Sequence, residues 1–212
     1  EFSYYKLLTE KNNSIWNIDD LINSIKIGAV KDLIEKLRIE NEVKEKSKIK
    51  KQLPAVSISG IFGNSRTQDQ LLKYSGLIQL DFDKVPELNS VITKIKNDPY
   101  SFICFISPSG NGIKLICKVE PDSNKHKWSF NTLSKYFRDK YKIVADESCK
   151  DVTRLMFLSY DPEISINKNS AIWTFDIFQS ENYNRLVNWI NKDQKFIEGN
   201  RHNYLLKLAF AC

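Results

Sequence analysis

Two aspartates, Asp81 and Asp83, end an apolar run in the stretch LIQLDFD. Side chains alternate between the two faces of a strand, so both carboxylates point to one side and Phe82 to the other. Like charges this close repel, so either one aspartate is protonated or a positive group lies between them. Paired carboxylates suit a hard cation such as Mg²⁺ or Mn²⁺. A lone D-x-D sequence is also typical of a solvated strand end.

A glycine-bearing turn, SPSGNGIK, lies between two later apolar runs. Hydroxyls and exposed backbone N–H groups in such a turn can cradle a phosphate, and the lysine beyond it supplies positive charge. The same residues also suit a plain hairpin turn. The stretch is not a P-loop, because it lacks a G-K-[ST] ending. The candidate phosphate-binding residues are Ser107, Ser109, Gly110, Asn111, Gly112 and Lys114.

A third acidic position and an arginine follow further along the chain. Asp146 comes directly after Ile143-Val144-Ala145, near the end of a short apolar run, and could be a third carboxylate of the same site. Arg154 begins another apolar piece, RLMFLS, where a charge needs a partner. The alternative interpretation is an ordinary surface acid and a structural ion pair.

Composition restricts the class of protein. A chain of 212 residues is one large domain or two small lobes, and 42% hydrophobic residues are enough for a folded core. The formal net charge of +6 favours a polyanionic partner, such as nucleic acid or nucleotides, although a lysine-rich surface alone gives the same sign. With two histidines and no H-E-x-x-H sequence, a metalloprotease is excluded.

The cysteines indicate a reducing compartment. Cys104, Cys117, Cys149 and Cys212 form no C-x-x-C pair, so we expect reduced thiols in a cytoplasmic protein rather than a zinc site or disulfides. No apolar run is long enough for a membrane span, and no signal peptide is expected. The chain starts without Met and stops inside an expected helix, which suggests a monomeric piece of a longer protein.

The first half of the chain predicts a helical segment and then strands. Apolar residues recur at helical spacing from about Asp19 to Lys51, and Asp19 or Asp20 could cap the start. The stretch LPAVSISGIFGNSR then predicts a strand and a turn. A short helix is expected from Thr67 to Tyr74, and the strand LIQLDFD follows it.

The second half predicts alternating helices and strands. ELNSVITKIKND is an expected helix, and SFICFISPS and IKLICKVE are expected to pair as a hairpin. Aromatic residues at helical spacing predict a helix from about Asn124 to Tyr141 that packs in the core. IVADES and RLMFLSYDP predict short strands, and the tail predicts helices near Tyr183–Asn191 and from Arg201. This order favours a mixed-sheet α+β or α/β fold.

The three candidate motifs, in this order, resemble the archaeo-eukaryotic primase superfamily. The pattern is hhhDhD, then S-x-S-G-x-G-x-K, then an hD followed by an arginine. It looks most like the branch of VirE N-terminal-type and CRISPR-associated primase-polymerase domains. The resemblance covers roughly Leu53 to Pro162. The tail segment EGNRHNYLLKLA also resembles the start of the helical domain that often follows such cores.

The resemblance implies a fold and a site. The family core is a small N-terminal α/β lobe packed on an RRM-like lobe, with the active site between them. By carry-over, Asp81, Asp83 and Asp146 would bind two Mg²⁺ or Mn²⁺ ions, while the turn, Lys114 and Arg154 would hold the triphosphate of a nucleotide. Most of the superfamily has histidine at the position of Lys114. Lysine keeps the charge for phosphate but loses the exchangeable proton.

The implied activity is template-dependent primase-polymerase activity. The substrates would be dNTPs or NTPs, and the partners a single-stranded DNA template and a primer, in mobile-element replication or a CRISPR-associated context. De novo priming needs a second nucleotide site, for which Arg66, Arg201 and His202 are candidates by charge and position alone.

The expected organisation is a helical N-terminal extension over residues 1–51, a catalytic core over 52–180 and C-terminal helices over 181–212. Two other functions stay open. A non-catalytic module that binds single-stranded nucleic acid could keep the fold, although the presence of all three acids argues against it. A metal-dependent nuclease also clusters acids, but it leaves the glycine turn and Lys114 unexplained.

Overall fold

The computed structural model describes residues 1–7 and 13–193. The chain divides into two compact units, Glu1–Trp173 and Thr174–Cys212. In the second unit the structure describes helix α6 (Phe175–Asp193). The three-part organisation expected from the sequence stays a prediction. Within the described ranges, no helix has the length and apolar character needed to cross a membrane.

The first unit has the mixed α+β architecture that the sequence predicts. Its strands are β1 (Phe2–Tyr5), β2 (Ser14–Trp16), β3 (Ala55–Ser57), β4 (Gly60–Phe62), β5 (Leu71–Tyr74), β6 (Leu77–Phe82), β7 (Ile103–Ile106), β8 (Ile113–Val119), β9 (Met156–Phe157), β10 (Ser165–Ile166) and β11 (Ile172–Trp173). Its helices are α1 (Ile18–Ile27), α2 (Lys31–Ile39), α3 (Val43–Lys51), α4 (Leu88–Lys96) and α5 (His126–Tyr141), with short 3₁₀ turns η1 (Gln68–Gln70), η2 (Ser123–Lys125) and η3 (Glu147–Lys150).

The larger sheet is built around β8, which is antiparallel to β6 and to β7. β10 pairs with the outer edge of β7, and β11 pairs in parallel with the end of β8. The predicted hairpin of SFICFISPS and IKLICKVE is therefore confirmed, with Ile103 opposite Ile116 and Ile106 opposite Ile113. The register of β6 on β8 places Asp81 directly opposite Lys114.

A smaller antiparallel sheet has the strand order β2-β1-β3-β9. β4 and β5 form a separate two-stranded ribbon. The Tyr4 ring stacks on the Trp16 ring across β1 and β2, with centroids 3.9 Å apart. β1 joins the sheet beside β3, so residues from the N-terminal fifty and from the motif region share one sheet.

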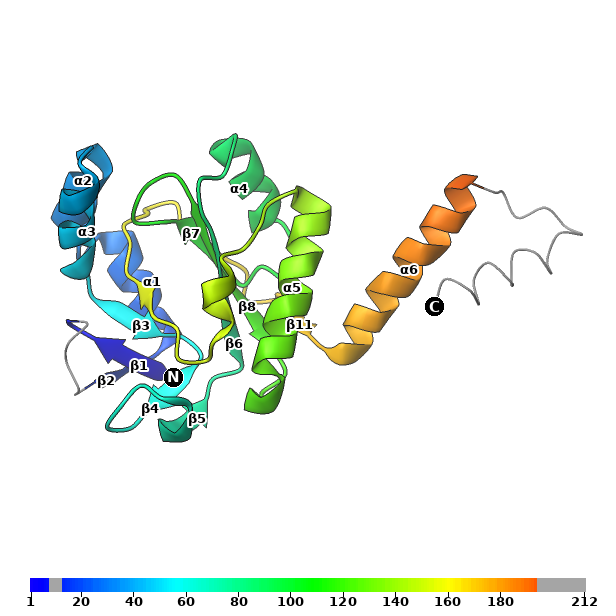
Figure 1. The fold of residues 1–212 in the computed structure, drawn as a ribbon, viewed down its shortest axis with the longest axis horizontal. Helices are drawn as coiled ribbons and strands as arrows, with labels where there is room; N and C mark the ends of the chain where they lie inside the picture. Colours follow the sequence, from blue (N-terminus) through cyan, green and yellow to red (C-terminus); the bar gives the residue numbers. More distant parts are fainter. Residues whose placement is uncertain (8–12, 194–212) are drawn as a thin grey trace, which may run out of the picture. The chain divides into compact units, whose positions relative to one another are not determined.

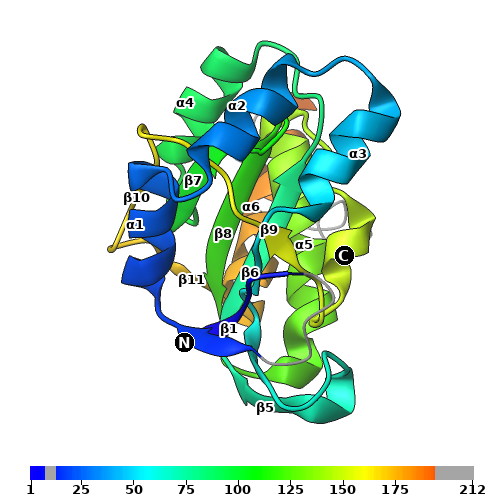
Figure 2. The same cartoon turned by 90° about the vertical axis from the view of Figure 1, so that its left-hand side faces the viewer.

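Helices and the small sheet enclose the larger sheet from opposite sides (Figure 1). α4 and α5 lie along one face, where the Phe82 and Phe137 rings are 6.1 Å apart. On the other side lie α1, β1 and β3, and Figure 2 shows α1 and α2 in front of β7 and β8. One apolar core joins the layers there, in which Phe2 and Leu21 share a cluster with Ile103 and Phe105. Asp81 precedes Phe82, so its side chain points to this second side.

The expected helical segment of residues 19–51 is three separate helices. Gly28 ends α1 with φ of +86°, a left-handed conformation that glycine adopts without strain. The predicted cap at Asp19 or Asp20 was wrong. Asn17 caps α1, since its side chain accepts from the backbone N–H groups of Asp19 and Asp20, and the Asp20 carboxylate accepts from the Asn17 N–H in return.

Two further local predictions differ from the structure, and two strands were not predicted. Thr67–Tyr74 was expected as a helix, but it forms η1 and then strand β5, because β5 pairs with β4. IVADES forms no strand; Val144 is exposed and the turn η3 follows Asp146. Neither β1 nor β2 was predicted; β2 pairs with β1, and β1 pairs with β3, which lies at least fifty residues further along the chain.

Candidate nucleotide-binding and catalytic site

The strand pair β6–β8 places a lysine against the first aspartate of the D-x-D sequence. Lys114 Nζ donates to Asp81 Oδ2 over 2.5 Å. Lys114 is 5% exposed, so its ammonium group is buried and needs this carboxylate. The positive group that the two aspartates require is thus supplied, at Asp81, by a neighbouring strand.

The other oxygen of Asp81 is left without a partner. Oδ1 of Asp81 is buried, and no hydrogen-bond donor reaches it among the described residues. A buried carboxylate oxygen in this state costs free energy unless a ligand satisfies it. Asp81 therefore combines one oxygen fixed by Lys114 with one oxygen open to a donor or a cation.

Asp146 lies beside Asp81 because the two backbones are joined. The Asp146 N–H donates to the Asp81 carbonyl oxygen over 2.8 Å. This bond holds Asp146 at the free edge of β6, opposite to the edge that pairs with β8. The sequence prediction that Asp146 belongs near Asp81 agrees with this geometry, although no strand carries it.

The Asp146 carboxylate caps η3 and stays ionised. It accepts from the Ser148 N–H (2.9 Å) and hydroxyl (2.5 Å), and Arg154 Nη2 lies 3.6 Å from its Oδ2. Partial burial alone would raise the pKa of Asp146, but the Ser148 hydrogen bonds and the charges of Arg154 and Lys114 outweigh it and lower the pKa. Arg154 is therefore paired with Asp146, as a charge in an apolar segment requires.

The glycine turn closes the β7–β8 hairpin next to the end of β6. The Ser107 N–H donates to the Gly112 carbonyl over 2.9 Å, and the Gly110 N–H donates to the Ser107 carbonyl over 3.0 Å. Gly110 has φ of +80°. A Cβ on Gly112 would lie 2.4 Å from the Phe82 carbonyl oxygen, so only glycine allows this close approach to β6. Ser109 and Asn111 are exposed at the tip.

Arg38 is a residue of this site that the sequence did not indicate. Its Nη2 donates from α2 to the carbonyl oxygens of Ser107 (3.3 Å) and Tyr160 (2.9 Å). Its side chain packs on Gly110, where an added Cβ would lie 3.2 Å from the Arg38 Cγ. Burial lowers the pKa of Arg38, while the charge of Asp161 opposes the shift. The N-terminal helices contain many charged residues, and no local sequence feature sets Arg38 apart from them. Its role became visible only from the packing of α2 against the β7–β8 hairpin.

The other predicted site residues have no contact with Asp81 or Asp146 that the structure records. Asp83 is exposed, one residue beyond the end of β6 and beside Gly112. Arg66 is exposed and donates to the Thr153 carbonyl over 2.7 Å, which brings it to the loop that carries Arg154. Arg201 and His202 lie outside the described residues.

The donor set fits a hard cation, but a three-carboxylate cage is not preassembled. Among the described residues, no three His, Cys, Asp or Glu side chains are grouped so that they could hold a metal ion. The unpartnered Asp81 Oδ1, with Asp146 beside it, suits Mg²⁺ or Mn²⁺, which bind through one or two carboxylates plus waters and substrate phosphates. Asp81 and Asp146 are thus the better-placed ligands, and Asp83 would need to turn toward them.

Comparison with known proteins gives a family. The family model described as BT4734-like, N-terminal domain, matches residues 48–165, more than half of the chain, so the chain belongs to this family. No curated protein matches the chain. The solved structure described as the crystal structure of primase RepB' is similar to it at a TM-score of 0.37 and 12% identity over 96% of this chain. The chain spans 62% of the length of that protein.

Proposed function

We propose that this member of the BT4734-like N-terminal domain family is a primase-polymerase domain. It would transfer nucleotides from dNTPs or NTPs to a strand that is templated by single-stranded DNA, and it would start such strands de novo. One observation carries the proposal: Asp81, with an open carboxylate oxygen, lies beside Asp146 and Lys114 at the base of a glycine turn. The order of these motifs matches the superfamily that the sequence resembles.

The acidic residues would bind the reacting end of the substrates. Mg²⁺ or Mn²⁺ held by Asp81, Asp146 and Asp83 would neutralise phosphate charge and favour ionisation of the attacking hydroxyl. Lys114 holds Oδ2 of Asp81, which leaves Oδ1 as the oxygen that a cation would bind. The low pKa of Asp146 keeps that residue ionised at neutral pH, ready to accept a cation.

The turn and nearby cations would hold the nucleotide triphosphate. A lysine ammonium has three donors, and Asp81 uses one of those of Lys114. Arg154 is 45% exposed and can reach a phosphate without losing Asp146. Arg38 supplies a further guanidinium beneath the turn, and its buried Nε has no hydrogen-bond partner in the part of the chain that the structure describes. These cations would stabilise charge that develops on the leaving phosphates.

The surroundings of the site agree with a nucleic-acid partner. A net charge of +6 would hold the template through its backbone, with little reading of sequence. Arg66, beside the Arg154 loop, could contact the template or an initiating nucleotide. The three cysteines in the described ranges are free and buried, as we expect for a cytoplasmic protein.

A primer-free synthesis assay tests the proposal. The chain would be incubated with a single-stranded DNA template, labelled dNTPs or NTPs and Mg²⁺ or Mn²⁺, beside an Asp81→Asn variant. Asp32→Asn, on the exposed face of α2, is the matched control. Short products that disappear only in Asp81→Asn would support a primase.

Extension that needs a supplied primer would correct the proposal to a polymerase that does not initiate. Absence of synthesis by the wild-type chain, with template binding intact, would overturn catalysis and favour a single-strand binding module. Degradation of the template that Asp81→Asn abolishes would instead favour a nuclease.

A further inference from the structure

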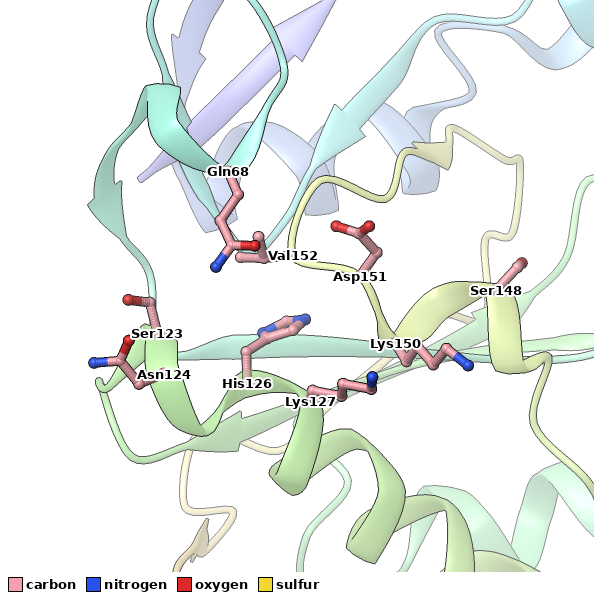
Figure 3. A pocket seen from close by; sticks show the side chains of 9 residues that line it. All are labelled: Gln68, Ser123, Asn124, His126, Lys127, Ser148, Lys150, Asp151 and Val152. Carbon is pink, nitrogen blue, oxygen red and sulfur yellow. The ribbon is translucent and has the colours of Figure 1, made fainter.

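A polar pocket of about 530 Å³ lies between η1, the start of α5 and the segment that contains η3. Figure 3 shows the lining side chains, with His126 below Gln68 and Lys127 and Lys150 to one side. All the residues that line it are polar or charged except Val152. A pocket of this size can hold a small ligand, and its lining suits a charged one rather than an apolar one.

His126, at the first position of α5, has a buried ring nitrogen without a hydrogen-bond partner in the described part of the chain. The residue is 3% exposed. Its Nδ1 lies 2.8 Å from the Tyr74 hydroxyl. Its Nε2 is buried and has no hydrogen-bond partner among residues 1–7 and 13–193. In Figure 3 the ring lies at the centre of the pocket, with its outer nitrogen on the side of Lys150 and Asp151.

The protonation of this pair makes Nε2 a hydrogen-bond donor. Burial lowers the pKa of His126 to about 4, so the ring is neutral at physiological pH. Burial also raises the pKa of Tyr74, which keeps its proton. His126 Nδ1 is the acceptor that the described structure offers to the Tyr74 hydroxyl, so we assign the imidazole proton to Nε2. The result is a buried N–H group, in a residue that lines the pocket, without an acceptor among the described residues.

The electrostatics of the pocket favour an anion. Lys127 follows His126 in the first turn of α5, and Lys150 reaches the pocket from η3. No acidic residue lies in the first turn of α5, although η2 runs directly into this helix and the Ser123 carbonyl accepts from the His126 N–H. The one carboxylate in the lining, Asp151, already accepts from the Thr153 N–H (2.9 Å) and hydroxyl (2.8 Å).

We propose that this pocket binds a phosphate group, with the His126 Nε2–H, Lys127 and Lys150 as its donors. The pocket adjoins the candidate catalytic site through Ser148, which lines the pocket and also donates to Asp146. The phosphate belongs either to a free nucleotide or to a nucleic-acid strand. The proposal does not depend on synthesis by Asp81 and Asp146, since it rests on the pocket's own residues.

The test follows the ring signals of His126 by NMR while inorganic pyrophosphate, dATP or a single-stranded dT₁₀ oligonucleotide is added to the full chain. EDTA removes divalent cations, so that metal-dependent loading of Asp81 does not contribute. The chain has two histidines, and His202→Gln assigns their signals. We expect saturable shifts of the His126 ring signals with pyrophosphate. Tighter binding of dATP would identify a nucleotide, and tighter binding of the oligonucleotide would identify a strand.

The matched comparison uses two double variants. Lys127→Ala with Lys150→Ala removes two pocket charges and should weaken binding by about tenfold, the loss expected for two partly exposed charge contacts. Lys44→Ala with Lys94→Ala removes two exposed charges elsewhere and should leave binding unchanged. His126 signals that none of the three probes moves, or equal affinities of the two double variants, would overturn the proposal.

Discussion

Two aspartate–lysine pairs on the larger sheet and its helices, each with one buried member, have very different surroundings. Asp98, which follows α4, is 1% exposed, and both of its oxygens are occupied. Oδ2 accepts from the Tyr136 hydroxyl (2.9 Å), Lys140 Nζ (2.8 Å) and the Tyr141 hydroxyl (2.7 Å). Oδ1 accepts from the Tyr100 N–H over 2.9 Å. This carboxylate joins α4, α5 and the loop before β7, and it has no capacity left for a ligand.

Asp81 is also paired with a lysine, but only one of its two carboxylate oxygens has a hydrogen-bond partner among the described residues. Lys114 occupies Oδ2, while Oδ1 is buried without a partner in the described chain. Ser107 Oγ and Arg38 Nε, near the adjoining turn, are also buried and unpartnered within the described ranges. Stability alone explains the saturated Asp98 carboxylate, whereas the unpartnered atoms around Asp81 support the ligand site proposed above. The comparison therefore sets a structural pair against the pair that we propose to be functional.

The largest expected effect is on catalysis at Asp81. Asp81→Asn keeps an oxygen that can accept from Lys114 but removes the charge of the open oxygen, so we expect nucleotide incorporation to fall by about a thousandfold. Initial rates of templated extension measure this. Rates are compared per folded molecule, because Asn leaves the buried Lys114 charge uncompensated and should lower stability. A rate within threefold of wild type would show that the open oxygen is not used.

The next effect is on stability at Asp98. Asp98→Ala leaves two tyrosine hydroxyls, a backbone N–H and Lys140 without their acceptor, and we expect a loss of about 3 kcal/mol in the free energy of unfolding. Urea denaturation measures it, with Asp32→Ala as the exposed control. The rate per folded molecule should not change. Reduced activity at full stability would contradict the structural assignment of Asp98.

A paired replacement sharpens the comparison. Asp81→Leu alone leaves the ammonium group of Lys114 buried and unpaired, whereas Asp81→Leu with Lys114→Met removes the whole pair. We expect the double variant to lie within about 1 kcal/mol of wild-type stability, because an apolar pair of similar size avoids the desolvation of two charges. Urea denaturation of both variants tests this. A double variant less stable than Asp81→Leu would show that the pair itself supports the fold.

The smallest effect concerns Asp146, whose carboxylate is only partly occupied. Its pKa is lowered in the folded protein, so its ionised form stabilises the fold above its ordinary pKa, and this contribution is lost as pH falls through the lowered value. Ser148→Ala removes one of the hydrogen bonds responsible, and should move the acid limb of the activity profile upward by about half a pH unit. Rates measured between pH 4 and pH 8 test this, with the exposed Ser90→Ala as control. An unmoved acid limb would exclude Ser148 as a positioning residue for Asp146.

Local patterns were enough for part of this molecule. The alternation in LIQLDFD predicted β6, glycine and serine residues predicted the β7–β8 turn, and helical spacing predicted α4 and α5. These elements follow from contacts between near neighbours in sequence, which periodicity records. The candidate residues Asp81, Asp146 and Lys114 could be named from type and order for the same reason.

Long-range pairing decided the rest. The contact of Lys114 with Asp81 comes from the register of β6 on β8, and the position of Asp146 comes from one backbone hydrogen bond to β6. Long-range packing also brings Arg38 to the glycine turn and His126 to the polar pocket beside η1 and η3. The sequence alone determined which side chains were available for this chemistry. The tertiary structure decided which of their atoms are satisfied and which stay open to a ligand, because burial and hydrogen-bond partners come from distant segments.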